Sequence, residues 1–185
     1  MGGNGMARQV ILFVAQSLDG YIAKLNGSVD FLNQQTAHGV DIDREYDKLT
    51  EHVDTVVMGR KTYSQVVNQL SPEIYPYVDF QNYIMTSKPA PSTENLHFVS
   101  GSVDQLVEKL KKQTGKDIWI IGGSSIITPL VNANLIDVYQ IGVVPEILGE
   151  GIPLFPHEVK THHLELISAE KINQVAYLTY HRLHE

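Results

Sequence analysis

Three short runs of apolar, β-prone residues constrain the fold of this chain more than any other feature. They are Val10–Val14, Val53–Met58 and Ile118–Ile121. A strand with one face in water alternates apolar and polar residues, whereas a near-continuous apolar run is typical of a strand covered on both faces. Gly59 and Gly122 directly follow the second and third runs, and glycine lets the chain turn sharply there. We therefore predict three central strands with well-defined carboxyl ends.

Helical patterns separate these strands. The predicted helices are Asp43–His52, Thr62–Leu70 and Ser102–Thr114, with a short strand at Tyr83–Thr86. The chain after residue 134 is richer in strands, which we expect at Leu135–Val144, Leu164–Lys171 and Val175–Leu183. The last two should pair antiparallel around a turn at residues 172–174. This order predicts an α/β fold whose mostly parallel sheet has an antiparallel carboxyl-terminal edge.

Size and composition favour one folded domain. The chain has 185 residues, of which 43% are hydrophobic and 19% are charged, and its composition shows no break. We expect a single domain over residues 7–185, preceded by a flexible leader at residues 1–6. The longest apolar run is far shorter than the ~20 residues of a membrane-spanning helix. A cytoplasmic protein with no membrane partner is the expectation.

Charge and residue usage exclude several functional classes. Fourteen Lys and Arg against 21 Asp and Glu give a net charge of −7, which argues against a nucleic-acid partner. The chain has no cysteine, so a thiolate metal site and a cysteine nucleophile are excluded. The adjacent pair His162 and His163 would point to opposite faces of a strand and cannot converge on one ion. We predict no metal site.

Two predicted strand-to-helix turns lie where an α/β sheet binds ligands. The residues 59–62 and 122–125 follow the carboxyl ends of buried strands and offer backbone N–H groups at helix starts. Arg60 and Lys61 add two cations to the first turn, which would suit a phosphate. Alternatives remain open: two tight turns, a solvated cation pair, and Thr62 as a helix cap.

Three segments, in order and spacing, resemble the signature segments of the dihydrofolate reductase superfamily. They are residues 17–23, 56–63 and 118–123, and residues 148–155 are similar to the reductase domain of the bacterial bifunctional riboflavin-biosynthesis deaminase-reductase. The resemblance implies a dihydrofolate reductase-like three-layer α/β/α sandwich. It also implies an oxidoreductase that transfers hydride from NADPH to a small-molecule substrate.

The resemblance implies a cofactor site drawn from five parts of the chain. Its residues are Ala15, Asp19, Gly20, Ile22, Gly59, Arg60, Lys61, Thr62, Ser87, Lys88, Gly122, Gly123, Ser124, Ser125 and Ile126. Ala15 and Ile22 would flank the nicotinamide, although core packing explains them equally well. Ser87 and Lys88 would meet the 2′-phosphate, or form only a polar turn. The bond between Gly122 and Gly123 is expected to be cis.

The resemblance also implies a substrate side. Asp43 and Asp30 are its candidate catalytic carboxylates, and Phe31, Asp47, Gly149 and Gly151 are its candidate substrate-binding residues. Helix capping is the alternative for Asp43, and ordinary packing is the alternative for Phe31. Ile141 stands where dihydrofolate reductases carry a threonine that supports the buried acid. This departure argues against dihydrofolate as the substrate.

These features give one leading function and two alternatives. The leading hypothesis is an NADPH-dependent reductase of a small heterocycle or a ribosylaminopyrimidine, as in riboflavin biosynthesis. Dihydrofolate reduction is the alternative enzyme, and a non-catalytic NADP(H)-binding or interaction domain is the alternative of another class. We also expect a homodimer, because residues 139–144 supply apolar strand surface that a monomer would leave partly exposed.

Overall fold

An eight-stranded mixed sheet forms the centre of the protein. The computed structural model describes residues 7–33, 42–88 and 90–183, and for Ile42 and Asp43 it describes the backbone alone. The strand order is β5-β4-β3-β6-β1-β7-β10-β9. The strands are β1 (Val10–Gln16), β3 (Val53–Gly59), β4 (Gln81–Met85), β5 (Leu96–Val99), β6 (Asp117–Gly122), β7 (Val138–Val143), β9 (Leu164–Ile172) and β10 (Val175–Arg182). The first six are parallel, and β10 and β9 add the predicted antiparallel edge.

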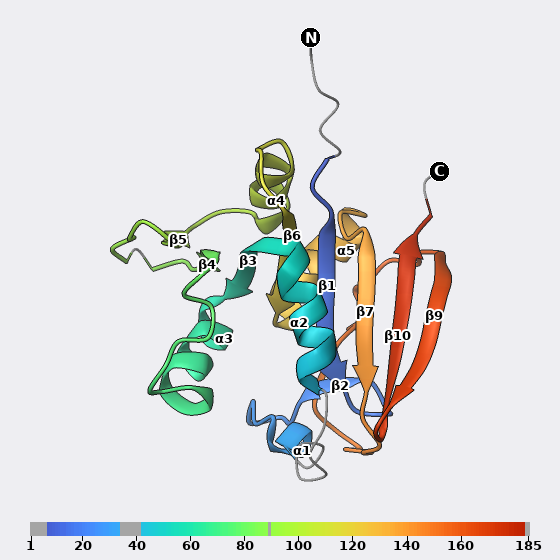
Figure 1. Cartoon of the computed structure of the whole chain (residues 1–185). Helices are drawn as coiled ribbons and strands as arrows, with labels where there is room; N and C mark the ends of the chain where they lie inside the picture. The colour runs from blue at the N-terminus through green and yellow to red at the C-terminus, as the bar shows by residue number, and fades with distance from the viewer. Residues whose placement is uncertain (1–6, 34–41, 89, 184–185) are drawn as a thin grey trace.

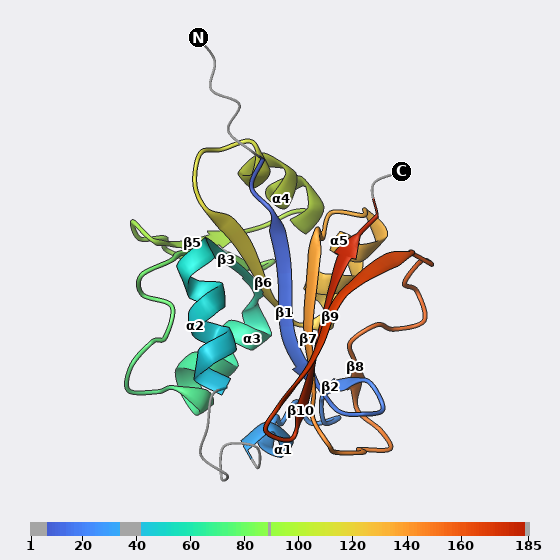
Figure 2. The ribbon, with the colours of Figure 1, turned by 45° about the vertical axis from the view of Figure 1, so that its right-hand side comes forward.

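Helices cover both faces of the sheet, which confirms the predicted three layers (Figures 1 and 2). They are α1 (Asp30–Asn33), α2 (Ile42–His52), α3 (Arg60–Gln65) with a π-helical continuation at Val66–Leu70, α4 (Val103–Lys111) and α5 (Ser124–Asn132). Helices α2 and α3 lie on one face, and α4 and α5 lie on the other. Within the described part of the chain, no helix has the length and apolar character needed to cross a membrane.

The apolar runs form strands because alternate side chains enter two different cores. On β1, Val10 and Leu12 join the core cluster that also holds the buried residues of α4 and α5. Ile11 instead joins the cluster under α2, which contains Leu49 and Trp119. Because both faces of the strand are buried, both sets of alternating positions must be apolar. The sequence prediction of two-faced central strands is confirmed.

The strand surface that we expected to support a dimer is not exposed. Strand β7 is hydrogen-bonded to β1 on one side and to β10 on the other, and Tyr139 and Ile141 are only 2% and 7% exposed. The prediction that residues 139–144 leave apolar surface open is therefore wrong. The outer strands of the sheet are β5 and β9, and on β9 Leu166 and Ile167 are about half exposed. A homodimer remains a proposal.

Candidate active site

The two predicted strand-to-helix turns meet at the same end of the sheet. Strands β3 and β6 are neighbours, and Met58 pairs with Gly122 at their carboxyl ends. A β-carbon placed on Gly123 would lie 3.8 Å from the Thr62 hydroxyl oxygen, and one placed on Gly59 would lie 3.3 Å from Cγ1 of Ile126. Glycine at position 59 therefore lets α5 pack closely against the end of β3, and glycine at position 123 leaves the space beside Thr62 open.

Gly122 occupies a backbone conformation that favours glycine. Its φ is +117°, and an added β-carbon would lie 3.3 Å from Cδ1 of Ile127. The peptide bond from Gly122 to Gly123 is cis, as predicted. Gly123 itself has φ −75° and ψ −159°, an extended conformation open to other residues. The backbone conformation explains why residue 122 is glycine. It does not explain Gly123, for which the space beside Thr62 is the remaining reason.

Some hydroxyl groups of the two turns have a structural role, and others are available to a ligand. The residue before α3 is Gly59, and no side chain caps that helix, so the alternative role of Thr62 as its cap is wrong. The Ser124 hydroxyl donates to the Pro153 carbonyl oxygen at 2.5 Å, which joins α5 to the strand β8 (Ile152–Pro153). Ser125 is exposed. Thr62 and Ser125 are therefore the hydroxyls left to face a ligand.

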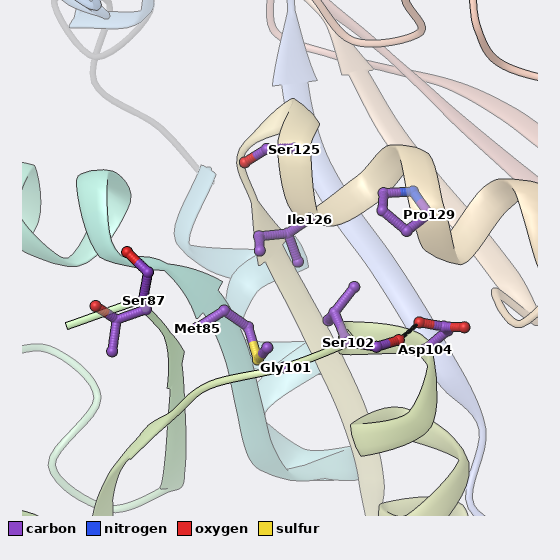
Figure 3. Close-up of a pocket in the computed structure, with 10 residues that line it drawn as sticks. Met85, Ser87, Gly101, Ser102, Asp104, Ser125, Ile126 and Pro129 are labelled. Atoms are coloured by element: carbon purple, nitrogen blue, oxygen red, sulfur yellow. Dashed lines mark hydrogen bonds between the residues drawn. The ribbon is translucent and has the colours of Figure 1, made fainter. Parts of the chain in front are cut away.

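A cavity of about 430 Å³ lies beside the second turn (Figure 3). Its walls are Met85, Thr86, Ser87, Gly101, Ser102, Val103, Asp104, Ser125, Ile126 and Pro129. These residues come from the end of β4 and the starts of α4 and α5. Hydroxyl groups and apolar carbons dominate the lining, which suits the base and ribose of a nucleotide. Ser87 lines the cavity as the cofactor prediction requires, whereas Lys88 is exposed beyond it.

Three exposed cations follow the carboxyl ends of strands β3 and β4. Arg60, Lys61 and Lys88 are exposed, and within the described ranges none of them forms a salt bridge. The Arg60 guanidinium instead lies 4.9 Å from the ring centroid of Phe98 and 5.6 Å from that of Tyr63. These stacking contacts hold the guanidinium in place while its N–H donors stay available to an anion.

Asp19 has a structural partner on the loop between β7 and β8. Its carboxylate accepts hydrogen bonds from the Ser17 hydroxyl at 2.7 Å and from the amides of Leu148 and Gly149 at 3.1 and 2.8 Å. The Ser17 bond, followed by these amide bonds, lowers the pKa of Asp19. Asp19 thus ties two loops together, and any effect on a cofactor passes through the position of those loops.

The glycines of these loops also have local reasons. Gly20 and Gly149 have φ of +89° and +76°, values that favour glycine. An added β-carbon on Gly151 would overlap the Ala23 carbonyl oxygen, because β8 lies directly against β2 (Tyr21–Ala23). Gly149 and Gly151 thus have backbone reasons to be glycine, and their assignment to substrate binding stays a prediction.

Small and aromatic residues lie on the α2 face at the carboxyl end of β1. Ala15, Gly142 and Tyr177 pair across β1, β7 and β10 and share one face of the sheet. The Tyr177 ring lies against Gly142, where an added β-carbon would be 3.3 Å from ring atom Cε1. Phe31 is 3% exposed and packs in a cluster with Tyr177, so its structural role is packing. Ile22 packs against the core on the other face of the sheet.

The candidate acids of the sequence analysis have different surroundings. Asp43 lies in the first turn of α2, but its side chain is outside the described residues. Asp47 is exposed on the same helix. Asp30 is 59% exposed and lies 2.7 Å from the Lys24 ammonium, and this hydrogen bond lowers its pKa. None of the described carboxylates in this set is buried against the sheet.

Glu45 is the acidic residue that the sequence analysis missed. Its side chain is 17% exposed, whereas that of Arg44 beside it is 56% exposed. Burial, and secondly the negative charge of Glu45, raises the pKa of Tyr177. The Glu45 carboxylate is therefore close enough to Tyr177 on β10 for its charge to act on the phenol. A signal was available, because Glu45 lies four residues before the buried Leu49, on the helix face that meets the sheet.

The argument from Ile141 is wrong. Ile141 belongs to the core cluster that contains Ile126 and Ile127 of α5. Residues of α2 pack on the opposite face of the sheet, in the cluster of Leu49. Because adjacent strand positions point to opposite faces, Ile141 cannot support an acid on α2. Its identity therefore says nothing about dihydrofolate.

Solved structures with this fold identify its class. Dihydrofolate reductase from Enterococcus faecalis, complexed with NADP(H) and RAB-propyl, matches with a TM-score of 0.65 and 21% identity over 94% of this chain and 96% of that one. A candidate riboflavin biosynthesis protein from Shewanella sp. PV-4 matches with a TM-score of 0.80 and 30% identity over 97% and 100% of the two chains. The protein has a dihydrofolate reductase-like fold, as predicted.

Within that class, the chain belongs to the RibD C-terminal domain family, which matches residues 8–178. The uncharacterized protein YwjB of Bacillus subtilis strain 168 is 35% identical over 178 residues, covering 96% of this chain and 99% of YwjB. The riboflavin biosynthesis protein RibD of Corynebacterium ammoniagenes is 25% identical over 162 residues, covering 80% of this chain but only 46% of RibD. The family match and the shared fold agree, and each covers nearly the whole chain.

Proposed function

We propose that this protein is an NADPH-dependent reductase of a small nitrogen heterocycle or a ribosylaminopyrimidine, the type of reaction found in riboflavin biosynthesis. The observation that carries the proposal is the meeting of the two glycine turns beside a cavity of about 430 Å³. The residues present fit a dinucleotide, because a side chain at Gly123 would enter the space beside Thr62 between the turns. When bound, NADPH supplies the hydride, and the protein supplies position and shelter from water.

Each part of the site has an assigned role in this proposal. Amides at residues 123–125 and the Thr62 hydroxyl bind the pyrophosphate, because the first N–H groups of α5 have no carbonyl partner within the helix, whereas the Ile126 N–H already donates to the Gly123 carbonyl oxygen. Ser87 in the cavity wall binds the 2′-phosphate. Lys88, which follows Ser87, and Arg60, which follows the neighbouring strand β3, assist it. Ala15 has only a methyl side chain, so the end of β1 leaves room for a flat nicotinamide ring.

In this proposal, the group that donates a proton to the substrate lies on the α2 face of the sheet. Glu45 is the described carboxylate that is most shielded on that face, and it lies towards Tyr177. Its shielded position near Tyr177 makes Glu45 the candidate proton donor. Asp30 is the weaker candidate because its side chain is 59% exposed, and each of the two carboxylates also pairs with a lysine, at 2.7 and 2.6 Å. Asp43 stays a proposal from the sequence alone.

Titration of the purified protein with NADPH tests the cofactor site. Trp119 fluorescence and calorimetry should both report saturable binding, and Thr62→Val should weaken it about tenfold, the loss of one hydrogen bond to a charged group. Thr161→Val, at an exposed residue outside the cavity, is the matched control and should bind as the wild type does. Absence of NADPH and NADH binding to the wild-type protein would overturn the proposal.

Oxidation of bound NADPH tests the reaction. Absorbance at the reduced nicotinamide band should fall when a pyrimidine or pterin substrate is added, and Glu45→Gln should lower kcat with little change in NADPH affinity. Glu51→Gln is the matched control on the same helix, because Glu51 is an exposed acid with no assigned role. Cofactor binding with no turnover of either substrate class would favour the non-catalytic alternative.

A further inference from the structure

A second cavity lies at the mouth of the substrate side. It has a volume of about 330 Å³ and is lined by Lys24, Leu25, Asn26, Leu148 and Glu150. These residues belong to the loop between β2 and α1 and to the loop between β7 and β8. Leu148 also packs in the cluster of Phe31 and Tyr177, which connects this cavity to the α2 face of the sheet. A substrate bound on that face would extend its substituent into this cavity.

The lysine in this cavity is already neutralised. Lys24 lies 2.7 Å from the Asp30 carboxylate, and Glu150 contributes a second exposed carboxylate to the wall. The lining and its ion-pair partner thus carry one positive and two negative charges. A phosphate entering here would have to separate Lys24 from Asp30 and would meet two like charges.

Helix α2 supplies no spare cation either. Lys48 and Arg44 both pair with Glu45, at 2.6 and 3.9 Å. Residues 34–41, which precede α2 in the sequence, include no lysine or arginine. Beside the glycine turns, in contrast, Arg60, Lys61 and Lys88 form no salt bridge in the described chain, as is also true of five lysines elsewhere, Lys109, Lys112, Lys116, Lys160 and Lys171. The structure therefore separates a cavity whose lining and ion-pair partner carry a net negative charge from turns that carry unpaired cations.

From this separation we propose that the substrate is a heterocycle without a phosphate group, bearing either no tail or a neutral hydroxylated one. This inference rests on the proposed function and narrows its substrate class. Hydroxyl groups can both donate and accept, so they can bond to the Asn26 amide and the Glu150 carboxylate without displacing Asp30 from Lys24. A phosphate has no such option, because it accepts hydrogen bonds but competes directly with Asp30.

Two ligands that differ only in the phosphate test the proposal. The probes are 5-amino-6-(5-phosphoribosylamino)uracil and its dephosphorylated form, each titrated calorimetrically into the full chain saturated with NADP⁺. The dephosphorylated compound should bind at least tenfold more tightly. Asp30→Asn should release Lys24 and tighten binding of the phosphorylated compound about tenfold. Glu158→Gln, which removes an exposed carboxylate outside both cavities, should change neither affinity.

The outcomes separate this inference from the function on which it rests. Equal or tighter binding of the phosphorylated compound by the wild type would overturn the inference and leave the reductase proposal standing. An unchanged affinity of Asp30→Asn for that compound would show that Lys24 is not the deciding group, which also overturns the inference. Binding of NADP⁺ with neither uracil would overturn both the substrate class and the inference. Failure to bind NADP⁺ would overturn the reductase proposal itself.

Discussion

Gly122→Ala should lower the stability of the protein, whereas Gly123→Ala should lower its affinity for NADPH, although the two residues are adjacent. At Gly122 the φ of +117° is strained for any L side chain, and the new β-carbon lies 3.3 Å from Cδ1 of Ile127. Such strain costs about 1–3 kcal/mol, partly offset by ~0.4–1 kcal/mol from a less flexible unfolded chain. Gly122→Ala should therefore lower the free energy of unfolding by about 1–2 kcal/mol, and the melting temperature by roughly 3–8 °C.

Gly123→Ala should instead preserve stability and lose the cofactor. The extended backbone of Gly123 accepts alanine, and the new β-carbon makes only ordinary contact with the Thr62 hydroxyl, at 3.8 Å. Its free energy of unfolding should stay within about 0.5 kcal/mol of the wild type. The methyl group occupies the space between the two turns, so NADPH affinity should fall at least tenfold, or ~1.4 kcal/mol.

Thermal unfolding without cofactor and calorimetric titration with NADPH measure the two effects separately. Both variants are needed, because general damage to the turn would reduce stability and affinity together. A Gly123→Ala protein that is stable and binds NADPH as the wild type does would refute the placement of the pyrophosphate between the turns. A Gly122→Ala protein that melts with the wild type would refute the reasoning from φ.

Three further predictions concern the rest of the molecule. Hydrogen bonding lowers the pKa of Asp19 in the folded protein, so its stabilisation of the loop is complete above the unfolded pKa of about 3.9 and is lost as the pH falls through the folded value. Hydrogen exchange at the Leu148 amide should accelerate in that acid range. The Asp19→Asn variant should show the fast rate at neutral pH. NADPH should bind more tightly than NADH at low salt and lose this advantage at high salt, since exposed Arg60 and Lys88 supply the difference; equal dissociation constants at low salt would contradict this. Asp137→Asn should destabilise the fold by about 2–3 kcal/mol in a denaturant titration, because it breaks partly buried contacts with two cations at 2.6 and 2.7 Å; a change below about 0.5 kcal/mol would contradict it.

The features that the sequence predicted most reliably depend on residues that are close together along the chain. The run Val10–Val14 becomes a buried strand because its own pattern excludes water on both faces. The helix expected at Asp43–His52 is observed at Ile42–His52. The turns at Gly59 and Gly122 meet because parallel strands end at a common edge. Each of these follows from periodicity or from a general rule about parallel sheets.

The wrong predictions depend on which elements become neighbours. Residues 139–144 look like exposed apolar surface until β10 pairs with β7 from the far end of the chain. Ile141 was misassigned because its face is set by the register with β1, which the sequence alone does not reveal. Asp19 bonds to an amide about 130 positions away, so no local pattern shows its role. Glu45 was missed because spacing was counted from Arg60, whereas helix periodicity would have placed it inward.

If the proposed function is correct, loops decide which substrate this scaffold reduces. The sheet brings Ala15, Gly59 and Gly122 to one edge by topology alone, and a fold shared with dihydrofolate reductase provides the same edge. The residues that face a substrate's substituent come instead from the loop after β2 and the loop after β7. Surface loops change without disturbing the core, so substrate charge can change while cofactor binding is retained. The ion pair of Lys24 with Asp30 is thus a more informative guide to the substrate than the fold itself.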